Sequence, residues 1–130
     1  MPAPISAKEA TQEFQHEAQA LWEEMNGWWN AHPQATLTEI EQHLRPLRRR
    51  FAAKLVELQV LQRGAGAPDQ LPVCPKCGQP MEDKGIQEKP VIGIELEGKI
   101  PHAYYHCPHC GEGFSPPPDP VAVDEAEPVD

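Results

Sequence analysis

The sequence predicts a small α+β protein: an N-terminal antiparallel helical hairpin, then a short β-hairpin ribbon carrying four cysteines, then an acidic tail. Apolar residues in the first half recur at spacings of three and four, which is typical of helices. In the second half, two Cys-x-x-Cys pairs flank a segment of strand-like composition. With 16 prolines and a hydrophobic fraction of 39%, the 130 residues do not favour one large core.

The first helix is expected at about residues 6–31. Ser6 and Glu9 have the spacing of a capping box, in which each side chain accepts a hydrogen bond from the other residue's backbone N–H. His32-Pro33 ends the helix, because the residue before a proline avoids helical geometry. The apolar stripe consists of Phe14, Ala18, Leu21, Met25 and Trp28 or Trp29.

The second helix is expected at about residues 37–63. Two overlapping capping boxes can start it, Thr36 with Glu39 or Thr38 with Glu41. Its apolar stripe consists of Leu37, Ile40, Leu44, Leu47, Phe51, Leu55, Leu58 and Leu61. Pro46 interrupts the pattern and predicts a kink that preserves the apolar face.

The two helices form a hairpin over residues 1–63, because only a short turn separates them. Trp22, Trp28 and Trp29 present more apolar surface than one partner helix readily covers. Two interpretations stay open. The helices form a homodimer, or the aromatic residues pack against the ribbon of the same chain.

The C-terminal half divides by composition into three segments. Residues 64–72 are expected as a flexible linker, and residues 73–115 as the ribbon. In the ribbon, we expect a strand at 91–96, a turn at 97–99 and a returning strand at 100–105. Residues 116–130 are rich in proline and acids and predict disorder.

The strongest motif is a five-residue pattern, Cys-Pro-x-Cys-Gly, that occurs at residues 74–78 and again at 107–111. Two residues between thiolates let both sulfurs reach one ion from a tight turn, and the glycine lets the backbone fold back. We therefore expect one structural Zn²⁺ per chain, without which the ribbon unfolds. Its ligands are Cys74, Cys77, Cys107 and Cys110.

Other uses of the cysteines are reactive dithiols, paired disulfides and iron. The 29 residues between Cys77 and Cys107 also resemble the spacing in rubredoxins, which carry electrons at an iron held by four cysteines. Rubredoxins have aromatic residues soon after the first pair, whereas residues 79–84 are Gln-Pro-Met-Glu-Asp-Lys. His102, His106 and His109 lie near the second pair, and we interpret them as groups around the site.

The net charge of −9 argues against a protein that coats nucleic acid non-specifically. Residues 45–63 nevertheless carry six basic groups against one acid, whereas residues 1–44 carry one lysine against seven acids. Two interpretations of this basic segment are equal: contact with DNA phosphates, or pairing with acids of the first helix. The candidate DNA-binding residues are Arg45, Arg48, Arg49, Arg50, Lys54 and Arg63.

Nothing in the remaining sequence combines a nucleophile, a base and an orienting acid, so we expect neither an enzyme nor a small-molecule substrate. No apolar stretch approaches the roughly 18 residues of a membrane span, and the first ten residues lack the apolar run of a signal peptide. We expect a cytoplasmic protein with no membrane partner.

The order of these motifs resembles the N-terminal region of insertion-sequence transposases of the ISKra type, over about residues 20–120. Residues 57–64 (Glu-Leu-Gln-Val-Leu-Gln-Arg-Gly), 74–81 (Cys-Pro-Lys-Cys-Gly-Gln-Pro-Met) and 104–114 (Tyr-Tyr-His-Cys-Pro-His-Cys-Gly-Glu-Gly-Phe) carry the resemblance. In that family a DNA-cutting domain follows, and this chain has no counterpart of it. The resemblance implies a non-catalytic zinc-ribbon module that binds DNA or assembles with a full-length transposase.

Two other functions stay open beside this one. The same helices and ribbon suit a protein-protein interaction adaptor that does not bind nucleic acid, and the charge of −9 favours that function. A rubredoxin-like electron carrier is the third.

Overall fold

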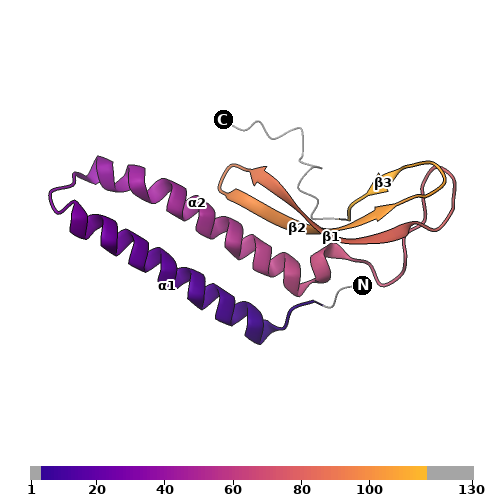
Figure 1. The fold of residues 1–130 in the computed structure, drawn as a ribbon, viewed down its shortest axis with the longest axis horizontal. Coiled ribbons are helices and arrows are strands. Elements are labelled where there is room, and N and C mark those ends of the chain that lie inside the picture. Colours follow the sequence, from indigo (N-terminus) through magenta and orange to yellow (C-terminus); the bar gives the residue numbers. More distant parts are fainter. Residues whose placement is uncertain (1–3, 117–130) are drawn as a thin grey trace.

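A computed structural model describes residues 4–116, which form two helices followed by a three-stranded antiparallel sheet of order β1-β2-β3 (Figure 1). The elements are α1 (Ala7–Ala31), α2 (Leu37–Gln62), the 3-10 helix η1 (Gly64–Gly66), β1 (Glu82–Ile92), β2 (Glu97–His106) and β3 (Gly113–Phe114). The predicted small α+β class is confirmed. The expected disordered tail is residues 116–130; Pro116 is described and buried, and residues 117–130 lie outside the described part of the chain.

Both helices begin at capping boxes that the sequence predicts. The N–H of Glu9 donates to Ser6 Oγ at 3.1 Å, and the N–H of Ser6 donates to Glu9 Oε1 at 3.1 Å. At α2 the chain uses Thr36 with Glu39 rather than the overlapping alternative, with distances of 2.8 and 3.2 Å. These bonds satisfy N–H groups that otherwise have no partner at a helix start.

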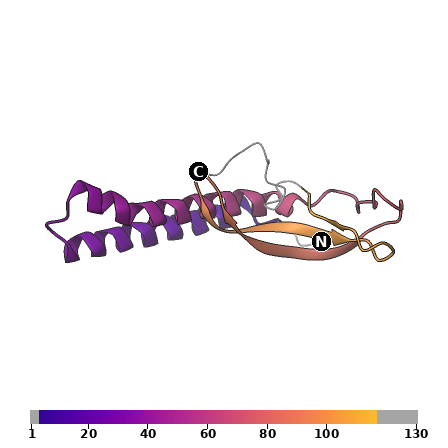
Figure 2. The ribbon, with the colours of Figure 1, turned by 90° about the horizontal axis from the view of Figure 1, so that it is seen from above.

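Helix α2 is the middle layer of the molecule, with α1 on one side and the sheet on the other (Figure 1). Phe14 and Phe51 lie in the seam between the helices, with ring centroids 5.3 Å apart. The helix continues through Pro46. The long β1–β2 hairpin runs beside the C-terminal half of α2 and extends beyond its end (Figure 2).

The contact between α2 and β2 is close. A Cβ built on Gly98 would lie 2.6 Å from Ala53 Cβ, which is shorter than real carbon contacts. Two residues further along the same strand face, Ile100 is buried with Val60 and Ala65. Glycine at position 98 therefore allows the strand to lie against the helix.

The β-hairpin turns earlier than expected. Ile92 pairs with Glu97, so the turn is the four-residue segment 93–96, which we call the tip loop. The expected turn at 97–99 is wrong, because these residues belong to β2. The N–H of Gly93 donates to the carbonyl of Leu96 at 2.8 Å and closes the loop.

Part of the segment expected as a flexible linker is packed. Residues 64–66 form η1, in which Ala65 adopts a left-handed conformation with φ of 57° and is fully buried. Its side chain lies in the same core cluster as Val60 and Ile100. This turn joins the end of α2 to the sheet.

The three tryptophans of α1 have different surroundings. Trp28 stacks on His43 of α2, with ring centroids 4.5 Å apart and planes 9° apart. Trp22 and Trp29 are 71% and 45% exposed. Within residues 4–116, neither helix has an apolar stretch that could cross a bilayer.

Candidate metal centre

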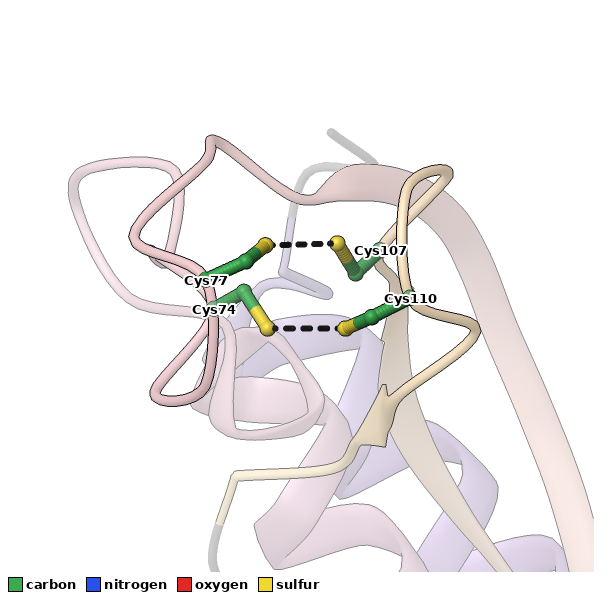
Figure 3. A group of neighbouring side chains, drawn as sticks. All are labelled: Cys74, Cys77, Cys107 and Cys110. Atoms are coloured by element: carbon green, nitrogen blue, oxygen red, sulfur yellow. Dashed lines mark hydrogen bonds between the residues drawn. The ribbon is translucent and has the colours of Figure 1, made fainter.

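The four cysteines meet at the end of the sheet farthest from the helix-helix turn (Figures 1 and 3). All four Sγ atoms lie within 4.8 Å of one another. Cys74 Sγ is 3.3 Å from Cys110 Sγ, and Cys77 Sγ is 3.4 Å from Cys107 Sγ. We call this group the cysteine centre. The clustering predicted from the repeated motif is confirmed.

The two cysteine turns have the same backbone design. In the first turn, the N–H of Gly78 donates to the carbonyl of Cys74 at 2.9 Å. In the second turn, the N–H of Gly111 donates to the carbonyl of Cys107 at 3.0 Å. The φ angles of these glycines are 74° and 78°, in the left-handed region that favours glycine. The repeated sequence pattern therefore reflects a repeated turn.

The turns are anchored by the strands around them. An isolated bridge joins Val73 to Pro80 at the base of the first turn. The second turn connects β2 to β3, where Tyr105 pairs with Phe114. The floor beneath the sulfurs is a buried cluster of Cys74, Met81, Ala103, Tyr105 and Cys107.

Sequence reasoning missed this floor, although a signal was present. Ala103 and Tyr105 alternate along β2, so they share one face of the strand, and Cys107 continues the alternation directly after its end. Burial raises the pKa of the Tyr105 hydroxyl. The strand that delivers the second turn thus also builds the apolar base of the cysteine centre.

The first cysteine of each turn favours the thiolate. The backbone N–H groups of Cys77 and Lys76 point at the Cys74 sulfur and lower its pKa to about 7 against the opposing effect of burial. The pKa of Cys107 is lowered in the same way by the N–H groups of Cys110 and His109. Hydrogen bonds to an ionised group stabilise it.

The second cysteine of each turn favours the thiol. In Cys110 the N–H of Glu112 acts to lower the pKa, but the neighbouring sulfurs and burial outweigh it and raise the pKa to about 12. In Cys77 the N–H of Gln79 is likewise outweighed, chiefly by the Cys107 sulfur, and the pKa is raised. Four negative charges at this separation repel one another, so a cation is needed to hold all four as thiolates.

An ion pair connects the two turns outside the sulfur cluster. Lys76 Nζ lies 3.1 Å from Glu112 Oε2, and this contact raises the pKa of the lysine. Lys76 precedes Cys77 directly, and Glu112 follows Cys110 by two residues. The pair links the two turns at the surface and was not predicted from the sequence.

The geometry suits one four-coordinate cation. An ion bound at about 2.3 Å by four thiolates in a tetrahedron separates the sulfurs by about 3.8 Å. The separations in the cysteine centre begin at 3.3 and 3.4 Å and stay within 4.8 Å, so they bracket this value. The separations of 3.3 and 3.4 Å exceed the roughly 2.05 Å of a disulfide bond, and all four cysteines are free. Among residues 4–116, the four-cysteine group is the one cluster able to hold a metal.

The histidines near the second turn lie outside this cluster. His102 is fully buried on β2, and its Nδ1 is 3.3 Å from the carbonyl of Ala103. Its Nε2 has no hydrogen-bond partner within the described residues. None of the three histidines takes the place of a cysteine in the cluster, and their role as groups around the site stays a prediction.

The three consecutive arginines of α2 bind two different parts of the chain, the tip loop and α1. Arg48 reaches Glu95 in the tip loop at 3.0 Å, and Arg50 reaches Glu24 of α1 at 2.6 Å. Arg49 donates to the carbonyls of Gly93, Ile94 and Leu96 at 2.9, 2.8 and 3.1 Å. Arg50 therefore pairs with an acid of α1, which is one of the two interpretations of the basic segment.

The other three basic residues of that segment differ. Lys54 pairs with Glu57 at 3.3 Å. Arg63 donates to the carbonyl and side chain of Gln59 at 3.0 and 2.6 Å. Arg45 lines two shallow hollows beside Pro46 and Gln42, and the structure gives it no hydrogen bond or ion pair within residues 4–116.

Comparison of the chain with protein-family models, with curated proteins and with solved structures finds no significant match.

Proposed function

We propose that the cysteine centre binds one structural Zn²⁺ and that residues 73–115 are a zinc ribbon. The observation that carries this proposal is four sulfurs within 4.8 Å of one another on two identically built turns. Zinc accepts four tetrahedral thiolates without redox chemistry, and a full set of protein ligands leaves no position for a substrate water. The centre therefore stabilises the ribbon and does not catalyse a reaction.

Metal analysis of the purified protein tests this assignment. The expected result is about one zinc per chain in a colourless protein. A red protein that contains iron would favour the electron carrier instead. A protein without metal whose cysteines are oxidised to each other would contradict both.

We further propose that the chain is a non-catalytic module that acts through protein-protein contacts. The supporting observation is the use of Arg48, Arg49 and Arg50 within the chain itself. Guanidinium groups engaged with carboxylates and carbonyls are not free to bind phosphates unless those contacts break. The net charge of −9 adds a general repulsion between the chain and DNA.

A second candidate is the DNA-associated transposition module that the resemblance to ISKra-type transposases implies. One observation favours it: the Arg45 guanidinium is without a partner in the described part of the chain. A free arginine on a helix is a group that can contact a phosphate. In this candidate the module binds transposon DNA or assembles with a full-length transposase.

A fluorescence anisotropy titration with a random-sequence DNA duplex separates the two candidates. Non-specific DNA complexes have a Kd of roughly 10⁻⁴–10⁻⁶ M at physiological salt and bind more tightly at low salt. The adaptor therefore predicts no binding at low salt with protein concentrations up to about 10 μM. The DNA module predicts binding that weakens steeply with salt and weakens further in Arg45→Gln. Arg63→Gln is the matched control, because Arg63 is already bonded to Gln59. Salt-dependent binding that Arg45→Gln weakens more than Arg63→Gln would overturn the adaptor.

A further inference from the structure

The two long flanks of the helical hairpin differ in chemistry. On one flank, Arg50 bridges the helices by contacting Glu24 at 2.6 Å and Glu17 at 3.8 Å. Glu17 and Glu24 are seven residues apart, so they stand on one line of α1 two turns apart. This flank is charged and ion-paired.

The other flank exposes large apolar side chains. On α1, Thr11, Trp22 and Trp29 are spaced by eleven and seven residues, which is three and two turns, so they form one line. On α2, Leu37, Leu44 and Leu55 have the same spacings and form a second line. A shallow groove between the helices is lined by both Thr11 and Leu55, which places the two lines on the same side. We call Trp22, Trp29, Leu37, Leu44 and Leu55 the apolar flank.

Exposure shows that this surface has no partner within the described chain. Trp22 is 71% exposed and Leu37 is 72% exposed, while Trp29, Leu44 and Leu55 are 38–45% exposed. Single exposed apolar residues are ordinary, but two aligned rows on adjacent helices form a continuous surface. The ribbon does not cover this surface, because it lies against the opposite part of α2 through Ala53 and Val60.

The lack of net charge on the apolar flank favours a second copy of the chain as its partner. In a two-fold symmetric contact the same patch meets itself, so a charged patch is repelled by its own copy. The helical neighbours of Trp22 are all uncharged, in a chain of net charge −9: Gln15, Ala18, Gln19, Met25, Asn26 and Trp29. Around Leu44, Glu41 and Arg48 are the charged neighbours, and their charges cancel.

From these observations we infer that the apolar flank is a self-association surface and that its occupant is the same flank of a second copy of the chain. Two helical hairpins joined in this way make a four-helix bundle, the usual way for such hairpins to bury a second apolar face. Trp22 and Trp29 of each copy fill the interface, and the charged flanks and the ribbons face outward. The inference names a partner for the proposed interaction module but does not depend on which metal the cysteine centre holds.

Light scattering coupled to size-exclusion chromatography tests the inference on full-length, metal-loaded protein. At about 100 μM, the expected mass is twice the 14.5 kDa of one chain. Trp22→Glu puts two new like charges into the interface, and the expected mass falls to that of one chain. Leu37→Glu is a second variant with the same expectation, chosen because Leu37 is as exposed as Trp22 and carries little of the fold.

The control variant is Ile92→Glu, at an apolar side chain that is 69% exposed beside the tip loop and outside the apolar flank. It should leave the double mass unchanged. Circular dichroism confirms that each variant keeps its helices. A wild-type mass of one chain overturns the inference. So does a mass of two chains in folded Trp22→Glu and Leu37→Glu, or loss of the dimer in Ile92→Glu alone.

Failure here is distinguishable from failure of the proposed function. A monomer that contains zinc and does not bind DNA keeps the adaptor and loses only this surface. A dimer that binds DNA keeps the surface and loses the adaptor.

Discussion

The guanidinium of Arg49 on α2 donates to the backbone carbonyl of Ile94 at 2.8 Å, across 45 residues of sequence. It donates at the same time to the carbonyls of Gly93 and Leu96, and only 12% of its side chain is exposed. Three acceptors that face one another in a short loop need a donor with several N–H groups in one plane, which only arginine provides. The tip loop is therefore held by the helix.

Replacement of Arg49 by Ala should weaken the docking of the ribbon on α2. Loss of hydrogen bonds from a charged donor is expected to lower the free energy of unfolding by about 1–3 kcal/mol. Urea unfolding of the metal-loaded protein measures it. Arg49→Lys should recover only part of the loss, because one ammonium cannot reach all three carbonyls in one plane.

Arg48→Ala is the matched control, since the Arg48 side chain is 52% exposed and has one exposed partner. Its expected effect is below about 0.5 kcal/mol. Equal effects of the two alanine variants would show that the carbonyl contacts of Arg49 do not stabilise the docked ribbon.

Gly98→Ala should disturb the contact between β2 and α2. The new Cβ would lie 2.6 Å from Ala53 Cβ, so the strand or the helix must move. Overpacking of this kind costs about 1–3 kcal/mol. Thermal unfolding measures the loss. Gly78→Ala is the comparison variant: its new Cβ meets no atom within 4 Å, so its cost comes from the backbone, whose φ is 74°, and not from a clash.

The double variant Gly98→Ala with Ala53→Gly tests the cause of that effect. Ala53→Gly alone costs about 1 kcal/mol, because glycine is a poor helix former. If the clash with Ala53 is responsible, the double variant loses less stability than the sum of the two single variants. Additive losses would place the strain elsewhere.

The ion pair between Glu24 and Arg50 should be visible in a titration. The hydrogen bond from Arg50 lowers the pKa of the Glu24 carboxyl below its ordinary value. Because the folded-state pKa is depressed, the pair stabilises the fold above the unfolded pKa, and this contribution disappears as the pH falls through the folded pKa. Carboxyl chemical shifts in NMR spectra measure the pKa, which should rise in Arg50→Met. An unchanged pKa in that variant would mean that the pair does not form in solution.

Removal of metal should unfold the ribbon and leave much of the helical signal. All three tryptophans lie in α1, whereas both tyrosines lie in β2 and Tyr105 is fully buried beside Cys107. Tyrosine signals in near-ultraviolet circular dichroism should therefore be lost on chelation or in Cys110→Ser, while tryptophan signals change less. His109→Ala is the control and should retain the metal, because His109 is not part of the cysteine centre. Retention of one metal per chain by Cys110→Ser would show that this cysteine is not a ligand.

Local sequence patterns predicted the start of α1 and the cysteine centre, and they narrowed the start of α2 to two overlapping capping boxes. Ser6 with Glu9 and Thr36 with Glu39 are short-range signals whose hydrogen bonds form within one turn. The cysteine motif occurs twice and each copy has the composition of the same metal-binding turn, so the sequence predicts that the two turns share one ion. Each of these features depends on residues close in sequence or on a strict chemical requirement.

The tip loop could not be placed in this way. The apolar run before Glu97 has strand-like composition, but its end bonds to Arg49, which is more than 40 residues earlier. The partners of Arg48 and Arg50 were equally impossible to predict, because adjacent arginines contact the tip loop in one case and α1 in the other. Contacts between long side chains and acceptors that are far away in the sequence leave no periodic signal.

The position of α2 between α1 and the sheet limits how this chain can be dissected. A fragment that ends at residue 63 bares Ala53 and Val60, which the intact chain covers with β2 and η1. A fragment that starts at residue 73 keeps all four cysteines. It lacks Arg49, which holds the tip loop, and Ala65, which packs against Ile100. Each fragment exposes core residues that the intact chain covers, so truncation experiments on this protein report the loss of a shared interface as well as the loss of the part removed.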